Sequence, residues 1–300
     1  MKFEFIISKW ANFYFFIQNL SEWHFSNRKN YNILWREELG QFSPEEENSL
    51  KEFKEIHLRY PFGESYLGRQ FFIEKNPWII LEQKLSQEDF INLKNIFSLL
   101  EKKFNLLWNK EEPLLLQWQK KLSDKINEPH LVKSIVDILN IIFNTSPSEF
   151  KININLLFSS PVQTGGGASI DNKSISLEIS RYPLNDANHA MGIIWHETIH
   201  LCFEKQYFLP LLYKKYLNDF DTINLIKESA ISSLFPNGVL GRKFLNSKNI
   251  TLNAKIPKNY VKTEELIKLI NIYIKKNKPL DNEYIEKVYF SISELKGILK

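Results

Sequence analysis

The chain has 300 residues, 43% of them hydrophobic, and 39 basic against 35 acidic residues give it a formal net charge of +4. A chain of this length and composition can bury one large core or two coupled cores, which excludes a disordered or fibrous protein. The charges are scattered instead of forming a long basic run, so the sequence gives no reason to expect a nucleic-acid partner.

The first twenty residues, MKFEFIISKWANFYFFIQNL, are rich in aromatic and aliphatic side chains. Glu4, Lys9 and Gln18 interrupt the apolar run and no small-residue cleavage site follows it, so we interpret the segment as an amphipathic helix and not as a signal peptide. Core packing of its aromatic residues is expected, with a membrane-surface or partner-binding role as the alternative. No run reaches the roughly 18 apolar residues of a membrane span, so we expect no transmembrane segment and a cytoplasmic location.

Residues from about 86 to 144 show repeated helical periodicity, as in FINLKNIFSLLEKKF and LVKSIVDILNIIF. Pro113 and Pro129 are expected to separate consecutive helices, because proline has no backbone N–H to donate within a helix. The sequence therefore predicts a mainly helical N-terminal region, residues 1–150.

A small sheet is predicted next. KININLLFSS, from residue 151, alternates apolar and polar residues as a half-buried strand does. GGGASIDNKSISLEIS, from residue 165, indicates a Gly-rich loop followed by a hairpin that turns near Asp171 and Asn172. Residues 151–300 are expected to form the second region, which begins with this sheet.

Helices are predicted for the rest of the chain. Asn185 or Asp186 is the expected N-cap of a helix that continues to about Tyr207, and TINLIKESAISSLF indicates another helix. The Lys-rich C-terminal segment indicates two more. Cys202, the single cysteine, excludes an internal disulfide, and its apolar neighbours predict a small buried side chain. The expected fold class is α+β and predominantly helical, with a small sheet packed on one long helix.

The segment GIIWHETIHLCFEK places two histidines four residues apart in that helix. Residues four apart lie on one helical face, so His196 and His200 can direct their imidazoles to one metal ion. Glu197 lies about 100° around the helix, where a carboxylate can reach a metal-bound water without binding the metal itself. This is the HExxH pattern of zinc hydrolases.

The alternative is two structural histidines beside a surface glutamate. Burial of two imidazoles and a carboxylate among apolar neighbours is costly unless a cation organises them. These neighbours are Ile193, Ile194, Trp195, Ile199 and Leu201. The composition of the helix therefore favours a metal site.

A catalytic zinc needs a third protein ligand. The metzincin extension is excluded, because Phe203 and Gln206 stand where it requires glycine and histidine. Glu204 lies eight residues after the first histidine, about 12 Å along the helix, so we expect a solvated or outer-sphere charge. Asp219 and Asp221 lie in a polar connection, where a turn residue and a helix N-cap are the favoured roles.

Glu228 is the strongest candidate for the third ligand. It follows His200 after 27 intervening residues, which is enough chain to turn and return a second helix against the first. Its helix is apolar over most of its circumference, through Ile223, Leu225, Ile226, Ala230, Ile231 and Leu234. A carboxylate in such a helix requires a cation, although pairing with a lysine or exposure to solvent remains the alternative.

These residues resemble the gluzincin branch of the zincin metallopeptidases, whose members carry His-Glu-x-x-His on one helix and a glutamate on a later one. The resemblance covers roughly residues 151–235 and implies that His196, His200 and Glu228 bind Zn2+ and that Glu197 is the general base. It also implies a zincin-like core in which an edge strand pairs with an extended peptide. GGGAS or the neighbouring SISLEIS would be that strand.

The resemblance implies a zinc metallopeptidase that acts on a peptide or protein substrate. An oxyanion-stabilising side chain is expected near the cleft, and the candidates are His189, Tyr207 and Tyr213, followed by Tyr216 and Arg181, each with ordinary packing or solvation as the alternative. Two other functions stay open: a structural or inactive zinc-binding module that engages a partner protein, and hydrolysis of a non-peptide amide. The sequence does not indicate an oligomeric state.

Overall fold

The structure is a computed structural model that describes residues 1–23, 29–60, 67–126, 128–146, 151–159, 165–169, 173–217, 219–246 and 264–298. The strands are β1 (Lys2–Ile6), β2 (Lys151–Leu157), β3 (Gly165–Ser169) and β4 (Ser174–Glu178). The helices before β2 are α1 (Lys9–Leu20), α2 (Lys29–Leu39), α3 (Pro44–Arg59), α4 (Leu67–Ile73), α5 (Pro77–Lys84), α6 (Gln87–Ile126) and α7 (Pro129–Ile142). Those after β4 are the short 3-10 helix η2 (Leu184–Asp186), then α8 (Ala187–Cys202), α9 (Phe208–Tyr216), α10 (Phe220–Ser232), α11 (Val239–Leu245), α12 (Glu264–Lys275) and α13 (Asn282–Ile298).

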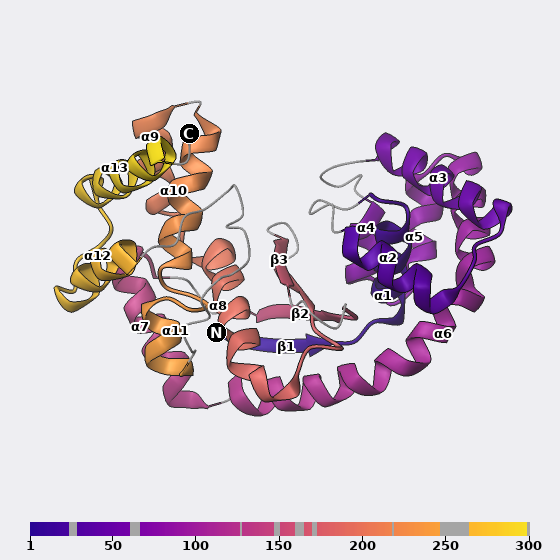
Figure 1. Cartoon of the computed structure of the whole chain (residues 1–300), viewed down its shortest axis with the longest axis horizontal. Helices are drawn as coiled ribbons and strands as arrows, with labels where there is room; N and C mark the ends of the chain where they lie inside the picture. The colour runs from indigo at the N-terminus through magenta and orange to yellow at the C-terminus, as the bar shows by residue number, and fades with distance from the viewer. Residues whose placement is uncertain are drawn as a thin grey trace.

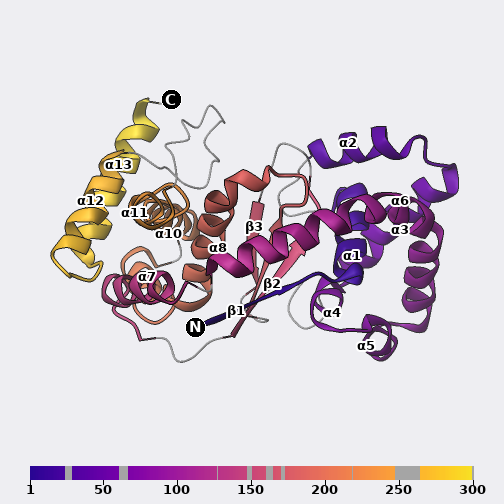
Figure 2. The same ribbon diagram turned by 90° about the horizontal axis from the view of Figure 1, so that it is seen from below.

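The fold is α+β and predominantly helical, as predicted. Figure 1 shows the sheet at the centre, with α1 to α5 on one side of it and α7 to α13 on the other. The long helix α6 connects the two sides, and Figure 2 shows it crossing the sheet. It contacts β1, β2 and α8, so one helix supports both the sheet and the helix that carries the histidine motif.

The sheet has the strand order β1-β2-β4-β3. β2 lies parallel to both β1 and β4, with Ile154 opposite Phe5 on one side and Ile175 on the other. β3 is antiparallel to β4, and Gly167 is paired with Ser176. The glycine-rich strand therefore forms one edge of the sheet, and α8 packs against it and against β4.

The N-terminal segment differs from its prediction as one amphipathic helix. Residues 2–6 form the strand β1 at one edge of the sheet, and every residue from Ala11 to Leu20 is buried in α1. The helix packs against α2, α3, α4, α6 and β2, so its apolar residues from Ala11 to Leu20 are covered within the protein. Its polar Asn12 is satisfied internally, because the side chain donates to Leu156 O at 3.1 Å and accepts from Phe158 N at 2.9 Å.

The predicted break at Pro113 is wrong, because this proline lies inside α6, a single helix of 40 residues. An interior proline costs a helix about 3 kcal/mol. Large apolar side chains are fully or almost fully buried on both sides of it, and each contributes roughly 1.5–3 kcal/mol, which outweighs that cost. They are Phe104, Leu107 and Trp108 before the proline and Leu115, Trp118 and Leu122 after it. The break at Pro129 is confirmed, since α7 begins there.

The predicted hairpin is formed by β3 and β4, and its turn near Asp171 and Asn172 lies outside the described residues. The Gly-rich segment is a strand and not a loop, because it hydrogen-bonds to β4 along its length. The region boundary expected at residue 150 is crossed by contacts: β1 joins β2 in the sheet, and α7 packs on α11 and α12.

The predicted helices of the second region are confirmed as α8, α10, α12 and α13, whereas α9 and α11 were not expected. α8 ends at Cys202, five residues earlier than predicted, where the Glu204 N–H turns back to Ile199 O at 3.2 Å. The prediction for the cysteine is confirmed: it is a buried free thiol, and burial raises its pKa to about 11. Within the described ranges, no helix combines the length and apolar character needed to cross a bilayer.

Candidate metal centre

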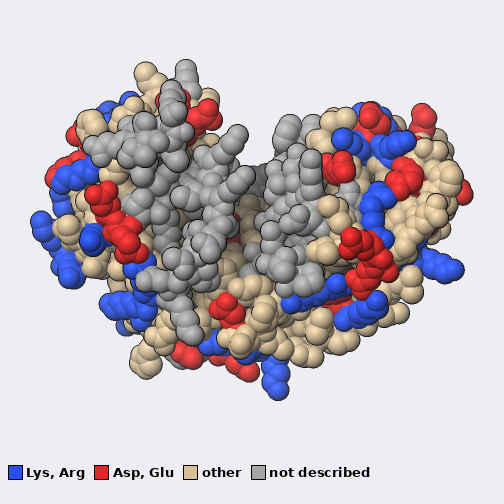
Figure 3. Space-filling model, in the orientation of Figure 1, with Lys and Arg blue, Asp and Glu red and all other residues tan. Residues whose placement is uncertain are grey.

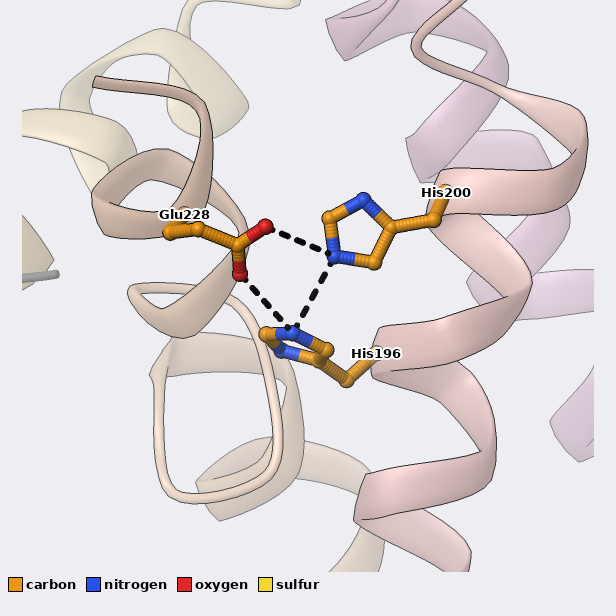
Figure 4. A group of neighbouring side chains, drawn as sticks. All are labelled: His196, His200 and Glu228. Atoms are coloured by element: carbon orange, nitrogen blue, oxygen red, sulfur yellow. Dashed lines mark hydrogen bonds and ion pairs between the residues drawn. The ribbon is translucent and has the colours of Figure 1, made fainter. Parts of the chain in front are cut away.

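Two helices bring His196, His200 and Glu228 together. Both histidines project from α8 towards α10, which carries the glutamate (Figure 4). The two ring Nε2 atoms lie 3.2 Å apart. Glu228 Oε2 lies 3.4 Å from Nε2 of His196, and its Oε1 lies 3.4 Å from Nε2 of His200. The structure thus gathers the three residues that the sequence singles out.

These separations match the spacing of ligands around one tetrahedral ion. Two ligand atoms held at about 2.0–2.1 Å from zinc, with a tetrahedral angle between the bonds, lie about 3.4 Å apart. The observed distances of 3.2, 3.4 and 3.4 Å are close to that value. The three residues form a group that could hold a metal ion, with their ligand atoms all within 4.8 Å of one another.

The outward nitrogens of both rings have acceptors of their own. His196 Nδ1 lies 3.2 Å from the backbone oxygen of Phe235, and His200 Nδ1 lies 3.0 Å from Glu204 Oε2. A carbonyl and a carboxylate can only accept, so each Nδ1 carries the proton. In the neutral rings both Nε2 lone pairs then face each other and the Glu228 carboxylate. Metal-binding histidines are commonly held in this way by an acceptor on the far nitrogen.

A positive charge is needed where these three groups meet. Burial lowers the pKa of His200, but the carboxylates of Glu204 and Glu228 outweigh it and raise the pKa to about 10. Burial raises the pKa of Glu228, but its bonds to the two rings outweigh this effect and lower the pKa well below the usual range. The Lys227 ammonium group, 3.5 Å from Glu228 Oε1, supplies part of this charge. Protons on the rings or a metal ion can supply the rest, and metal binding would displace those protons.

A close approach between α8 and the chain after α10 fixes the first histidine. Gly192 lies one turn before His196, and a Cβ built on it would lie 2.5 Å from Pro236 Cβ and 2.7 Å from Pro236 Cα. Only glycine fits this contact without displacement. The contact brings Phe235, the residue before Pro236, close enough for its carbonyl to accept from the imidazole.

Glu197 lies on α8 beside the edge strand. A Cβ built on Gly166 of β3 would lie 3.3 Å from Glu197 Cγ and 2.6 Å from Ile193 Cγ2. The carboxylate-bearing residue is half-buried, and the strand reaches it because this position has no side chain. Of the two segments expected as the edge, GGGAS forms it, while SISLEIS contributes β4 inside the sheet.

The other three acidic residues considered as ligands have different positions and partners. Glu204 is 3% exposed and bonds to the far side of His200, so it is not a solvated charge and would lie behind that ligand if a metal were bound. Asp219 caps α10 by accepting from Thr222 N at 3.0 Å, as expected of a helix N-cap. Asp221 lies in the exposed first turn of the same helix.

Lys227 is a charged residue of the site that the sequence analysis missed. Its Nζ lies 3.5 Å from Glu228 Oε1, and its side chain is only 19% exposed. The lysine pairing considered for Glu228 therefore exists alongside the two histidine contacts. Its position directly before the glutamate in the sequence was the available signal.

The three main oxyanion candidates lie at different places around α8. His189 is in the first turn of the helix, where its ring packs 5.9 Å from that of Tyr182. Tyr207 precedes α9 as its half-buried N-cap residue. Tyr213 is 43% exposed and packs its ring on Phe220 at 6.3 Å. An oxyanion role for any of them stays a prediction.

The two weaker candidates are engaged by other side chains. Arg181 forms ion pairs with Glu38 and with the buried Glu111. Tyr216 packs its ring against Tyr289 at 5.5 Å. Lysine, arginine and acidic side chains are interspersed over the face shown in Figure 3, where the described residues form no continuous basic patch.

Comparison of the chain with models of known protein families, with curated proteins and with solved structures found no match. The resemblance to zincins therefore stays an interpretation of the sequence motif.

Proposed function

We propose that the protein is a zinc-dependent peptide hydrolase. The observation that carries this proposal is the convergence of two Nε2 atoms and one carboxylate at tetrahedral spacing, with acceptors behind both rings. His196, His200 and Glu228 would hold the ion. Three protein ligands leave a fourth position for water or substrate, which is typical of catalytic zinc sites and not of structural ones.

The chemistry follows from the residues around that position. When bound, zinc supplies Lewis acidity and lowers the pKa of water. Glu197, which follows the first ligand on α8, accepts a proton from the attacking water and returns it to the leaving amine. A glutamate with this role needs access to solvent, and the side chain is half-buried instead of enclosed.

An extended peptide is the substrate class that the sheet edge favours. Within the described residues, β3 pairs with β4 on one side and ends the sheet on the other. A peptide that adds to such an edge gains main-chain hydrogen bonds. Gly166 lies against Glu197, so a strand bound along this edge would run past the proposed base.

The first test measures metal content. We expect about one zinc per chain in the purified protein and its loss in His196→Ala and His200→Ala, because each removes one ligand of three. Glu228→Gln should weaken zinc binding as well. Full zinc stoichiometry in both histidine variants would overturn the proposed site.

The second test separates catalysis from metal binding. Glu197→Gln should retain zinc and lower hydrolysis of a mixed peptide library by orders of magnitude, because an amide cannot accept the proton of water. A zinc-loaded protein that cleaves neither the library nor simple amides would instead favour the binding module. Turnover of amides but not of peptides would favour the non-peptide hydrolase.

A further inference from the structure

A second candidate site lies in the helical part that precedes the sheet. A cavity of about 350 Å³ opens between α1, α5 and α6. Figure 1 shows α1 and α5 on the opposite side of the sheet from α10. Its lining residues are Lys9, Trp10, Phe13, Trp78, Lys94, Phe97, Ser98 and Glu101. None of these residues belongs to the metal centre, and the volume lies within the range of small-molecule sites.

The floor of the cavity is aromatic and held in place by other rings. Phe97 is central: its ring lies 4.7 Å from Phe13, 5.1 Å from Trp78 and 5.0 Å from the stacked ring of Phe71 behind it. Trp10 packs edge-on against Trp78 at 5.7 Å. The phenylalanines are buried and the tryptophans half-buried, so a preformed apolar surface faces the cavity.

The mouth of the cavity carries more positive than negative charge. Lys9 and Lys94 are exposed, and their ammonium groups lie 6.0 Å and 5.4 Å from the ring centroids of Phe104 and Phe90. Neither lysine forms an ion pair with a carboxylate in the described part of the chain. Among the described residues of the lining, Glu101 is the single acidic one.

We infer that this cavity binds a small amphipathic carboxylate, with its apolar body on the aromatic floor and its carboxylate at Lys9 and Lys94. At about 30 Å³ for each water-sized group, the volume holds roughly ten to twelve such groups, which matches a body of about ten carbons. An anionic end suits two ammonium groups that lack a carboxylate partner, whereas a cationic end would be repelled by both of them.

The test compares three ligands that share a ten-carbon chain: decanoate, decanol and decyltrimethylammonium. We expect calorimetry to detect saturable binding of one decanoate per chain, and weaker binding of the other two. The double variant Lys9→Gln/Lys94→Gln should weaken decanoate by about tenfold and leave decanol unchanged. The control is Lys102→Gln/Lys120→Gln, which removes two exposed lysines of α6 outside the lining.

A second variant tests the location. Ser98 is exposed at the lining, so Ser98→Phe should fill the cavity from its mouth and abolish decanoate binding without loss of the fold. Binding should be the same in His200→Ala, because the cavity and the metal centre share no residue. Absence of saturable decanoate binding, tighter binding of decyltrimethylammonium, or indifference of decanoate to both variants would overturn the inference.

Discussion

Gly192→Ala is the substitution that most directly tests how the metal centre is assembled. The added methyl group would lie 2.5 Å from Pro236 Cβ, where ordinary contacts begin at 3.4 Å. The helix or the proline segment must therefore move by about 0.9 Å. Pro236 Cα is also within 2.7 Å, so rotation of a flexible side chain cannot relieve the overlap.

Two opposing effects set the magnitude for stability. Alanine in place of glycine stabilises a helix interior by about 1 kcal/mol. Overpacking of a close contact costs about 1–3 kcal/mol. We therefore expect a net loss of about 0–2 kcal/mol in the free energy of unfolding, which leaves the protein folded.

The effect on metal binding should be larger than the effect on the fold. Phe235 O lies 3.2 Å from His196 Nδ1, so a withdrawal of about 0.9 Å takes it beyond hydrogen-bond reach. Loss of an outer-sphere partner typically costs 10–100-fold in metal affinity. We expect a loss of that size, about 1.4–2.7 kcal/mol in the free energy of zinc binding.

Competition with a chromophoric zinc chelator at pH 7.5 measures this loss, and urea unfolding measures stability. The matched control is Gly167→Ala, because a Cβ at that position meets no atom within 4 Å. Its zinc affinity should equal that of the parent protein. Unchanged affinity in Gly192→Ala, or an equal loss in the control, would refute the proposed role of this glycine.

Three further predictions address the same helix and the core. Glu204→Gln should weaken zinc binding about tenfold, because Glu204 holds the outer nitrogen of His200. Glu197→Gln, the same exchange at the proposed base, should leave zinc affinity unchanged, and chelator competition compares the two variants. Gly166→Ala should lower peptide hydrolysis at unchanged zinc affinity, since its methyl group would press on Ile193 and Glu197; equal hydrolysis would count against it. Burial lowers the pKa of His57 from 6.5 to about 4, so its contribution to stability is present above pH 6.5 and lost as pH falls towards 4. Urea unfolding should show about 2.5 kcal/mol less pH-dependent loss between pH 7.5 and 4.5 in His57→Gln than in the parent; equal losses would contradict this assignment.

The features that could be predicted from the sequence depend on residues only a few positions apart. Residues four apart on a helix share a face whatever surrounds them, so the juxtaposition of His196 and His200 follows from α8 alone. The alternation at the start of KININLLFSS predicts β2 in the same local way, although the last four residues of the strand are all buried. Asp219 as the cap of α10 is equally local, since its partner is three residues away.

The features that were missed depend on partners far along the chain. Residues 2–6 form a strand because they pair with β2, which lies some 150 residues later in the chain. Nothing in the segment itself indicates this partner. Pro113 stays inside α6 because apolar residues on both sides of it find one continuous core. The role of Glu204 depends on the end of α8: the turn after Cys202 returns its carboxylate to the outer nitrogen of His200.

The two glycines beside α8 connect the metal centre to the sheet edge. Gly192 allows the segment after α10 to approach one side of the helix, close to His196. Gly166 allows β3 to approach another side, close to Glu197. The segment around Pro236 and the edge strand thus belong to distant parts of the sequence, and each approaches the same helix at a glycine. A change in either contact should move one group relative to the others while both histidines stay on α8. Gly192→Ala should therefore lower the metal affinity of the proposed hydrolase, and Gly166→Ala should lower its turnover. Each substitution adds one methyl group, so metal binding and catalysis should be affected separately.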